Sequence, residues 1–220
     1  MIDLHTHTLF SDGELLPFEL VRRAAVKGYT VLAITDHADA SNLDFVIPRA
    51  VCAAAELEGR TTVRVVPGVE LTHVPPSMIE SLAAEARRLG ALIVVAHGET
   101  VTEPVEPGTN RAAIMAGVDV LSHPGLIEED DVALAAERGV ALEITARRGH
   151  SITNGHVARL ALKYGAMMVV NTDTHAPGDL IDDETARKVL LGAGVPREFT
   201  EAAFENSEAL VFKALGRRNA

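Results

Sequence analysis

The chain has 220 residues, 47% of them hydrophobic and none of them Trp, and its formal net charge is -11. This length suits one sizeable domain, and the apolar fraction excludes an intrinsically disordered chain. The acidic balance and the lack of a basic patch argue against non-specific binding to duplex nucleic acid, which depends on neutralising phosphates. A short nucleotide partner stays open, because bound metal ions would supply positive charge.

The start of the chain lacks the basic and apolar segments typical of a signal peptide, and no apolar run approaches the length of a membrane span. We therefore expect a cytoplasmic protein with no membrane partner, whereas the oligomeric state stays undetermined. The single cysteine, Cys52, lies in an alanine-rich helical segment and is predicted to be buried.

Short apolar runs typical of strands alternate with segments of helical periodicity along the whole chain. Strands are predicted at about residues 1–4, 29–34, 63–69, 91–96, 118–122, 140–142 and 167–172. Helices are predicted at about residues 17–27, 43–57, 76–89, 110–116, 128–138, 154–164, 182–191 and 196–215.

Single residues refine this pattern. Pro48 predicts an early break in the second helix or a helix that restarts at that residue, because proline cannot donate the helical hydrogen bond. Asn154 is expected to cap the sixth helix, and residues 205–207 to break the last one. Residues 217–220 are predicted to form a frayed tail. Residues 98–109 form the longest irregular stretch, and loops of this length are often functional.

Seven strand–helix units in strict alternation predict an α/β fold with a parallel sheet and right-handed crossovers. Closing that sheet gives a distorted (β/α)7 barrel, which is TIM-like but one unit smaller. An open, doubly wound sheet is the alternative. In such barrels the chemistry lies at the C-terminal ends of the strands, so the predicted metal site belongs there. We expect a single domain over residues 1–220.

Two histidines, His5 and His7, follow the first apolar run at a spacing of two residues. On an extended strand alternate side chains point to the same side, so both imidazoles can face one centre. Two converging imidazoles indicate a site for zinc, iron or manganese. A surface strand with two solvated histidines is the alternative.

The other six predicted strands also end in residues that can bind metal. These are Asp36 with His37, Glu70, His97, His123, Glu143, and Asp173 with His175. Because the carboxyl ends of barrel strands meet at one end of the barrel, this repetition favours a metal centre over scattered surface histidines.

The loop after the sixth strand carries Arg147, Arg148 and His150. At least one of the arginines is expected to bind a substrate phosphate through its guanidinium, and a solvated loop pair is the alternative. His150 is a candidate for leaving-group protonation or substrate contact, with an incidental loop position equally open. His73 and His156 are expected to be structural or surface residues.

Six short motifs, taken in order, resemble those of the PHP (polymerase and histidinol phosphatase) family. They are Asp3-Leu4-His5-Thr6-His7, Thr35-Asp36-His37, Gly68-Val69-Glu70, His97, Ser122-His123-Pro124 and Thr172-Asp173-Thr174-His175. Each motif is short, but the ordered set is specific and spans residues 3–175. The resemblance implies a distorted (β/α)7 barrel, in agreement with the strand count.

The resemblance also implies three clustered divalent metal ions, which would be zinc, manganese or iron. Carried over position by position, the ligands are His5, His7 and Asp173 for the first ion, Glu70 bridging the first and second, His97 and His123 for the second, and Asp12, His37 and His175 for the third. Some histidinol phosphatases have a histidine where this chain has Asp12, and the carboxylate favours manganese or iron there. Glu143 lies outside this set and is expected to support it.

The chemistry implied by the resemblance is hydrolysis of a phosphate monoester. Clustered cations neutralise the phosphate oxygens and activate a water as hydroxide, so no side-chain nucleophile is required. Asp173 and His175 are then catalytic as well as metal-binding.

A small phosphorylated metabolite is the expected substrate, with histidinol phosphate as the candidate that the resemblance suggests. A nucleotide 3',5'-bisphosphate phosphatase or a short-oligonucleotide 5'-3' exonuclease is the alternative. The acidic chain, with 4% aromatic residues, mildly favours a small molecule over a stacked nucleic acid. A non-catalytic binding module is disfavoured, because all nine ligand positions hold competent residues.

Overall fold

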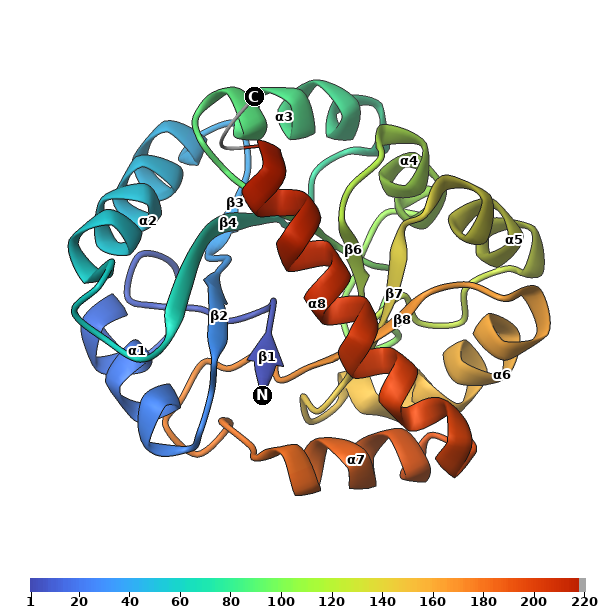
Figure 1. Ribbon diagram of the computed structural model, residues 1–220. Coiled ribbons are helices and arrows are strands. Elements are labelled where there is room, and N and C mark those ends of the chain that lie inside the picture. Colours follow the sequence, from blue (N-terminus) through green and yellow to red (C-terminus); the bar gives the residue numbers. More distant parts are fainter. Residues whose placement is uncertain (218–220) are drawn as a thin grey trace.

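Parallel strands form a ring surrounded by helices in the computed structural model, which describes residues 1–217 (Figure 1). The strands are β1 (Ile2–Asp3), β2 (Val31–Ile34), β3 (His37–Ala38), β4 (Arg64–Leu71), β5 (Ile93–His97), β6 (Val120–Ser122), β7 (Ala141–Thr145) and β8 (Met168–Asn171). The α-helices are α1 (Pro17–Val26), α2 (Leu43–Leu57), α3 (Pro76–Arg88), α4 (Thr109–Ala116), α5 (Glu129–Arg138), α6 (Asn154–Tyr164), α7 (Asp183–Gly192) and α8 (Thr200–Arg217). Short 3-10 turns cover His150–Thr153 and Arg197–Phe199.

The strands follow the order β1-β2-β4-β5-β6-β7-β8, and each neighbouring pair is parallel. An isolated parallel bridge between Thr6 and Thr174 joins the two ends of this order, so the sheet is nearly closed. The predicted distorted (β/α)7 barrel is confirmed. The short strand β3 pairs with the C-terminal end of β4. It was not predicted, because it lies in the polar segment after β2.

Small and branched apolar side chains fill the inside of the barrel. One buried cluster contains Leu4, Val31, Ala33, Val66, Ile93, Val95, Val120, Ala141 and Val169, together with Leu210, Val211 and Ala214 of α8. Figure 1 shows α8 crossing in front of the barrel, over the end at which the strands begin. Neither α8, with 18 residues, nor any other helix within residues 1–217 is long and apolar enough to cross a membrane.

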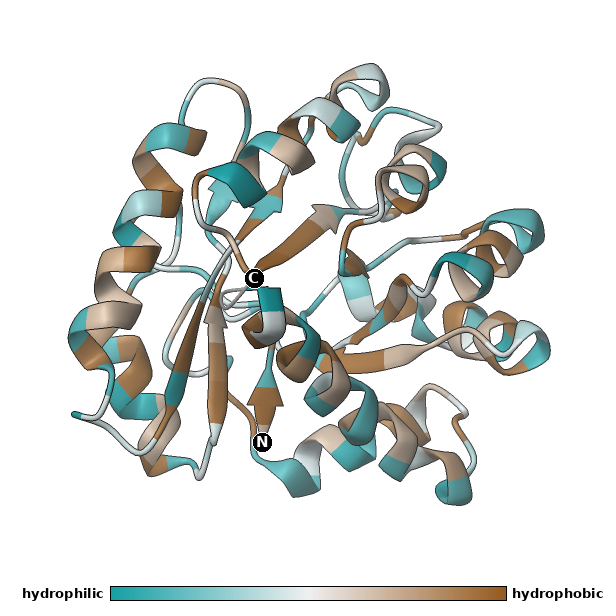
Figure 2. Cartoon of the chain, turned by 45° about the horizontal axis from the view of Figure 1, so that its top comes forward, coloured by the Kyte–Doolittle hydropathy of each residue, from teal (hydrophilic) through white to brown (hydrophobic). Residues whose placement is uncertain are grey.

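A second apolar layer lies between the strands and the surrounding helices. Leu20 of α1, Ile79 of α3 and Leu160 of α6 are all fully buried in it. Because the strands carry apolar side chains on both faces, they form continuous apolar runs in the sequence. Figure 2 shows this pattern as largely brown strands, with some teal segments, inside helices that are brown on some turns and teal on others.

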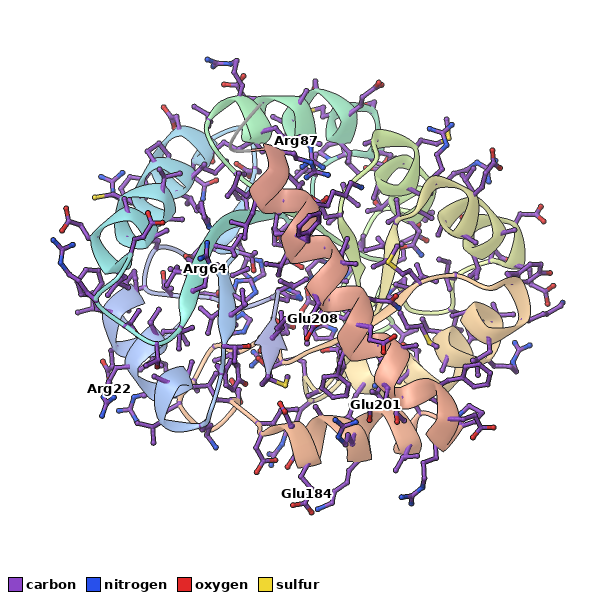
Figure 3. The ribbon with its side chains drawn as sticks, viewed as in Figure 1. Arg22, Arg64, Arg87, Glu184, Glu201 and Glu208 are labelled. Carbon is purple, nitrogen blue, oxygen red and sulfur yellow. The ribbon has the colours of Figure 1, made fainter. Side chains whose placement is uncertain are left out.

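Ion pairs fasten α8 at both of its ends. Near its C-terminus, Arg217 reaches the buried carboxylate of Asp119 at 2.9 Å, and Arg87 of α3 reaches the same carboxylate at 3.0 Å. Near its N-terminus, Glu201 pairs with Arg187 of α7. Figure 3 shows Arg87 and Glu201 at these opposite ends of the helix. The helix therefore closes the N-terminal end of the barrel firmly and leaves the other end for chemistry.

Two predicted helix breaks are wrong. Helix α2 continues through Pro48, because Val46, Ile47 and Ala50 are completely buried and their packing outweighs one missing hydrogen bond. Helix α8 continues through residues 205–207. Within that segment Asn206 donates to the carbonyl oxygen of Met168, so its polar side chain supports the packing of α8 on β8.

Three further expectations require correction. Cys52 is exposed, because it lies on the outer face of α2. Asn154 begins α6 without capping it, since its amide instead bonds both the N–H and the carbonyl of Thr145. Arg217 belongs to α8 and is held by Asp119, whereas the rest of the predicted tail, residues 218–220, lies outside the described residues.

Candidate metal centre

The nine residues expected to bind metal come together at the C-terminal end of the barrel. His5, His7 and Glu70 are fully buried. The others line a cavity of about 390 Å³ above them; these are Asp12, His37, His97, His123, Asp173 and His175. The strand-end pattern in the sequence therefore does correspond to one place in the molecule.

Side-chain hydrogen bonds fix the segment that carries the first two histidines. The Leu4 N–H donates to Asn171 Oδ1 at 3.0 Å. The Asp3 carboxylate accepts from the N–H of His5, and from both the N–H and the hydroxyl of Thr172. The segment after β1 is therefore tied to the segment after β8, although the two are far apart in sequence.

Glu143 orients the imidazole of His5. Its Oε2 lies 2.8 Å from His5 Nδ1 and accepts a further hydrogen bond from Asn171 at 3.0 Å. An imidazole that donates from Nδ1 keeps the Nε2 lone pair for a ligand. That Nε2 lies 3.2 Å from Glu70 Oε1 and 3.6 Å from Asp173 Oδ1. The predicted supporting role of Glu143 therefore has a direct geometric basis.

The same orientation recurs in three other histidines. His37 Nδ1 lies 2.7 Å from both Thr72 Oγ1 and Glu70 Oε2. His97 Nδ1 donates to the carbonyl of Gly98, and His175 Nδ1 donates to the carbonyl of Asp173. Each of these rings turns its Nε2 away from the bonded backbone or hydroxyl and toward the cavity, as metal-binding histidines usually do.

Glu70 lies at the centre of the cluster. Ser122 donates to its Oε1 at 2.7 Å, and His5 Nε2 approaches the same oxygen. Its Oε2 faces His37 Nδ1 and lies 3.8 Å from His7 Nε2. A carboxylate with histidines on both oxygens has the position that a bridging ligand between two ions requires.

Asp173 faces two buried histidines from the opposite side of the cluster. Its Oδ1 lies 3.1 Å from His7 Nε2, and its Oδ2 lies 3.7 Å from His123 Nε2. Asp173 and His123 have positive φ angles of 52° and 25°, which few residues other than glycine adopt. Such strain is typical of functional sites, where the surrounding structure holds it.

Asp12, His37 and His175 form a separate group on the open side of the cavity. Asp12 Oδ1 lies 3.2 Å from His175 Nε2 and 3.4 Å from His37 Nε2. Together with His7, these residues bring four donor atoms within 4.8 Å of one another. The sequence motif around Asp12 therefore does lead into the cluster.

The expected ligands of the second ion are less tightly grouped. His123 Nε2 lies 3.7 Å from Glu70 Oε1, but His97 turns its Nε2 to Glu103 at 3.1 Å. The two imidazole rings are adjacent, with their centroids 4.4 Å apart. His97 is thus beside the cluster but directed toward its rim.

Several atoms in the cluster fit the demands of a metal site. Among residues 1–217, His5 Nε2, His7 Nε2 and Asp173 Oδ1 are buried side-chain atoms that make no hydrogen bond. A buried polar atom that makes no hydrogen bond is unfavourable, and a cation among these nitrogen and oxygen atoms would satisfy them together. Imidazole nitrogens mixed with carboxylate oxygens suit zinc, iron and manganese.

The pKa values of several groups in the cluster are shifted by burial and by neighbouring charges. Burial raises the pKa of Asp173 to about 7, although the nearby His5 opposes the rise. Burial also lowers the pKa of His7 and of His123 well below the usual value, so neutral imidazoles are favoured there. Although burial opposes both shifts, Glu70 and Glu143 raise the pKa of His5 well above its usual value, and His5 and His37 hold the pKa of Glu70 well below its own. The buried carboxylates therefore attract positive charge, which a protonated imidazole or a bound cation supplies.

The two arginines of the loop after β7 have different positions. Arg147 lines the cavity and pairs with Asp179 at 3.0 Å, whereas Arg148 is exposed and is not among the described residues that line the cavity. The same Asp179 oxygen also accepts the backbone N–H groups of His175 and Ala176. Asp179 was missed in the sequence because it lies in a loop after the last motif, with no neighbouring signal.

His150 also lines the cavity, and its Nδ1 lies 2.7 Å from the hydroxyl of Thr100. Glu103 Oε1 lies 3.4 Å from His150 Nε2. Glu103 was missed as a site residue, although the unusual length of its loop was a signal for function. His156 bonds the carbonyl of Ile127 away from the cavity, whereas His73 lines the rim.

Comparison with known families gives one decisive match. The model of the PHP domain matches residues 3–216. The chain belongs to the PHP domain family. The resemblance inferred from the short motifs is therefore confirmed over nearly the whole described chain.

Relatives of this PHP protein include an uncharacterised protein of Methanocaldococcus jannaschii. It is 53% identical over 201 residues, which are 90% of this chain and 92% of the relative. A protein of Shewanella pealeana named probable phosphatase is 28% identical over 225 residues, with 90% of this chain and 86% of the relative covered.

Solved structures share the fold of this PHP protein at low sequence identity. A chain from archaeal ribonuclease P with mature tRNA matches with a TM-score of 0.72 at 16% identity, covering 96% of this chain and 90% of that one. A putative histidinol phosphatase from Listeria monocytogenes matches with a TM-score of 0.59 at 12% identity, covering 84% and 99%. These likenesses show the barrel fold.

Proposed function

We propose that this PHP protein is a metal-dependent phosphatase that hydrolyses a phosphate monoester at a centre of three divalent metal ions. The family membership and the relatives named probable phosphatases support this class of hydrolase. The finer elements of the proposal are the number of ions, their ligands and the kind of substrate.

One observation carries the proposal. Unbonded, buried donor atoms of His5, His7 and Asp173 all face the same space between β1, β4 and β8. Evolution of a stable fold alone would pair such atoms or replace them with apolar groups. A group of cations in that space gives each of them a partner.

In the proposal the first ion would be held by His5, His7 and Asp173, and Glu70 would be shared between the first and second ions. His97 and His123 would complete the second ion, and Asp12, His37 and His175 would hold the third. When bound, such ions neutralise phosphate oxygens and lower the pKa of water toward neutrality.

The chain's own residues have the tasks of binding and orientation. Arg147 presents its guanidinium to the cavity, and Asp179 holds that side chain while also bonding the backbone of His175. We propose that Arg147 binds the substrate phosphate. Asp179 would fix the position of the arginine relative to the His175 backbone, because it bonds both. His150 is proposed to contact the substrate or its leaving oxygen, because its ring lines the cavity. Arg148, being exposed, is the weaker candidate for phosphate contact.

A small phosphorylated metabolite fits this site best. The cavity has a volume of about 390 Å³, near the lower end for small-molecule sites. The side chains that line it are histidines, carboxylates, small polar residues and Arg147, with no Phe or Tyr among the described ones to stack a base. This lining favours a compact phosphomonoester, such as histidinol phosphate, over an oligonucleotide.

Phosphate release by manganese-loaded protein tests the function directly. The panel contains histidinol phosphate, nucleotide 3',5'-bisphosphates, mononucleotides, sugar phosphates and a short 5'-phosphorylated oligonucleotide, with metal-free protein as the control. A single substrate with kcat/KM at or above about 10⁴ M⁻¹s⁻¹, the low end for true enzymes, is the expected result. Metal binding without turnover of any substrate would instead support a binding module.

A further inference from the structure

A further group of donor atoms lies at the rim of the cavity. Glu103 Oε2 lies 3.1 Å from His97 Nε2 and also 3.1 Å from His73 Nε2. All three donor atoms lie within 4.8 Å of one another. Two of these residues, His73 and Glu103, are outside the ligand set that the family resemblance implies.

The spacing of these atoms suits a common ion. Donors about 2 Å from a tetrahedral zinc ion lie about 3.3 Å apart. The two distances from Glu103 Oε2 are close to that value. Two imidazoles and a carboxylate form a donor set used at catalytic zinc sites, and one open position remains for water or substrate.

The backbone of His73 gives an independent indication. His73 has a φ of 52°, in the left-handed region that residues other than glycine seldom adopt and that recurs at functional sites. This conformation places the His73 ring on the rim of the cavity, with its Nε2 facing Glu103 Oε2. An exposed ion pair is a weak interaction, whereas a shared cation would hold both side chains in this arrangement.

Glu103 is placed by a well-anchored loop. Glu99 Oε1 accepts the N–H groups of Gly108 and Asn110, which joins both ends of the loop. Gly125 packs so closely on this loop that a Cβ atom there would overlap the carbonyl of Glu99. The carboxylate of Glu103 is therefore held over the cavity, with Oε2 directed at two imidazoles.

His97 is common to the rim group and to the proposed second ion. Its Nδ1 donates to the carbonyl of Gly98, so Nε2 is the one nitrogen available for a metal. One lone pair binds one ion at a time. The rim position and the inner position beside Glu70 and His123 are therefore alternatives for the same imidazole.

We propose that His73, His97 and Glu103 form a rim site for a divalent metal ion, which alternates with the inner position of the second ion. The ion moves between an outer position, where Glu103 and His73 hold it, and an inner one beside Glu70. This proposal rests on the proposed metal centre only in that His97 belongs to both positions.

Zinc binding in a His123→Ala background tests the rim site, because that substitution removes a ligand of the inner position and keeps all three ligands of the rim. Bound zinc is counted by titration against a chromophoric chelator. We expect the His123→Ala protein to keep as many zinc equivalents as the wild type. Adding His73→Ala or Glu103→Gln should then lower the affinity for one equivalent at least tenfold.

The matched control is His123→Ala with His156→Ala, since His156 lies away from the cavity. It should bind zinc as the single variant does. The proposal is overturned if His123→Ala alone loses the equivalent, or if the His73 and Glu103 substitutions change nothing in that background. Wild-type protein that binds zinc but hydrolyses no phosphomonoester would refute the proposed function and leave these comparisons intact.

Discussion

Each end of the barrel buries an aspartate, and the two aspartates differ in the hydrogen bonds that they accept. At the N-terminal end, Asp119 is 2% exposed, and its oxygens accept from Arg87, Arg217 and the N–H of Val94. At the C-terminal end, Asp173 is also 2% exposed, yet its Oδ1 makes no hydrogen bond within the described residues.

This difference indicates that Asp119 serves the stability of the fold, whereas Asp173 serves the proposed site. A buried carboxylate with all its partners joins the elements around it, here α3, α8 and the start of β6. A buried carboxylate oxygen that accepts no hydrogen bond is unfavourable by itself, and Asp173 is proposed to be retained for the cation that it binds. The same substitution at the two positions should therefore have opposite consequences.

Asp173→Ala should have the largest effect on activity. Metal ions supply several kcal/mol to a reaction of this kind, so we expect phosphatase activity to fall about 1,000-fold or more. At least one metal equivalent should be lost. In metal-free protein the free energy of unfolding should be unchanged or higher, because an unsatisfied carboxylate is removed. Full activity in this variant would refute the metal assignment; Asp130→Ala, on the exposed first turn of α5, is the control.

Glu143→Gln tests whether the orientation of His5 matters. Removing the charge that faces His5 Nδ1 should lower the affinity for one metal ion about 10- to 100-fold, the usual effect of a partner behind a metal-binding histidine. Competition with a chelator measures the affinity. Glu137→Gln, an exposed position on α5, should bind metal as the wild type does. Equal affinities for both variants would remove Glu143 from the site.

Asp119→Ala tests the opposite end. It leaves the Val94 N–H and two arginines without their acceptor, and we expect a loss of about 2–3 kcal/mol in the free energy of unfolding. Urea unfolding of the metal-free protein measures this loss. The number of bound metal ions should stay the same. A reduced metal count would show that the two ends of the barrel are coupled.

Arg147→Lys should have the smallest effect of the four. A lysine keeps the charge but loses the two-pronged guanidinium, so we expect KM for the phosphate substrate to rise about tenfold with metal content unchanged. Arg148→Lys, at the exposed neighbouring position, is the matched control. An unchanged KM in both variants would exclude both arginines from phosphate binding.

The sequence predicted much of this molecule because one rule governs its site. His5, Glu70, His97 and Asp173 each lie at or just beyond the end of a strand, and a parallel barrel necessarily gathers such positions at one end. The apolar runs before them are long enough to be recognised individually. Fold and candidate ligands could therefore be inferred together from a single local pattern.

Residues that act through loops could not be inferred in the same way. Glu103 and Asp179 meet His97 and Arg147 only because their loops fold back over the cavity, and loop paths leave no periodic signal. The burial of Asp119 could not be inferred from the sequence either, because its partner Arg217 lies 98 positions further along the chain. Pro48 failed as a helix breaker because tertiary packing outweighed its local preference.

The seam between the first and last strands bears on how the chain assembles. Leu4 and Asn171 are 167 positions apart, and closing a loop of that length costs chain entropy before the contact can form. The ligands proposed for the first ion lie on both sides of this seam. A cation there would join the segments that follow β1 and β8. Hydrogen exchange of the β1 segment should therefore slow when metal binds.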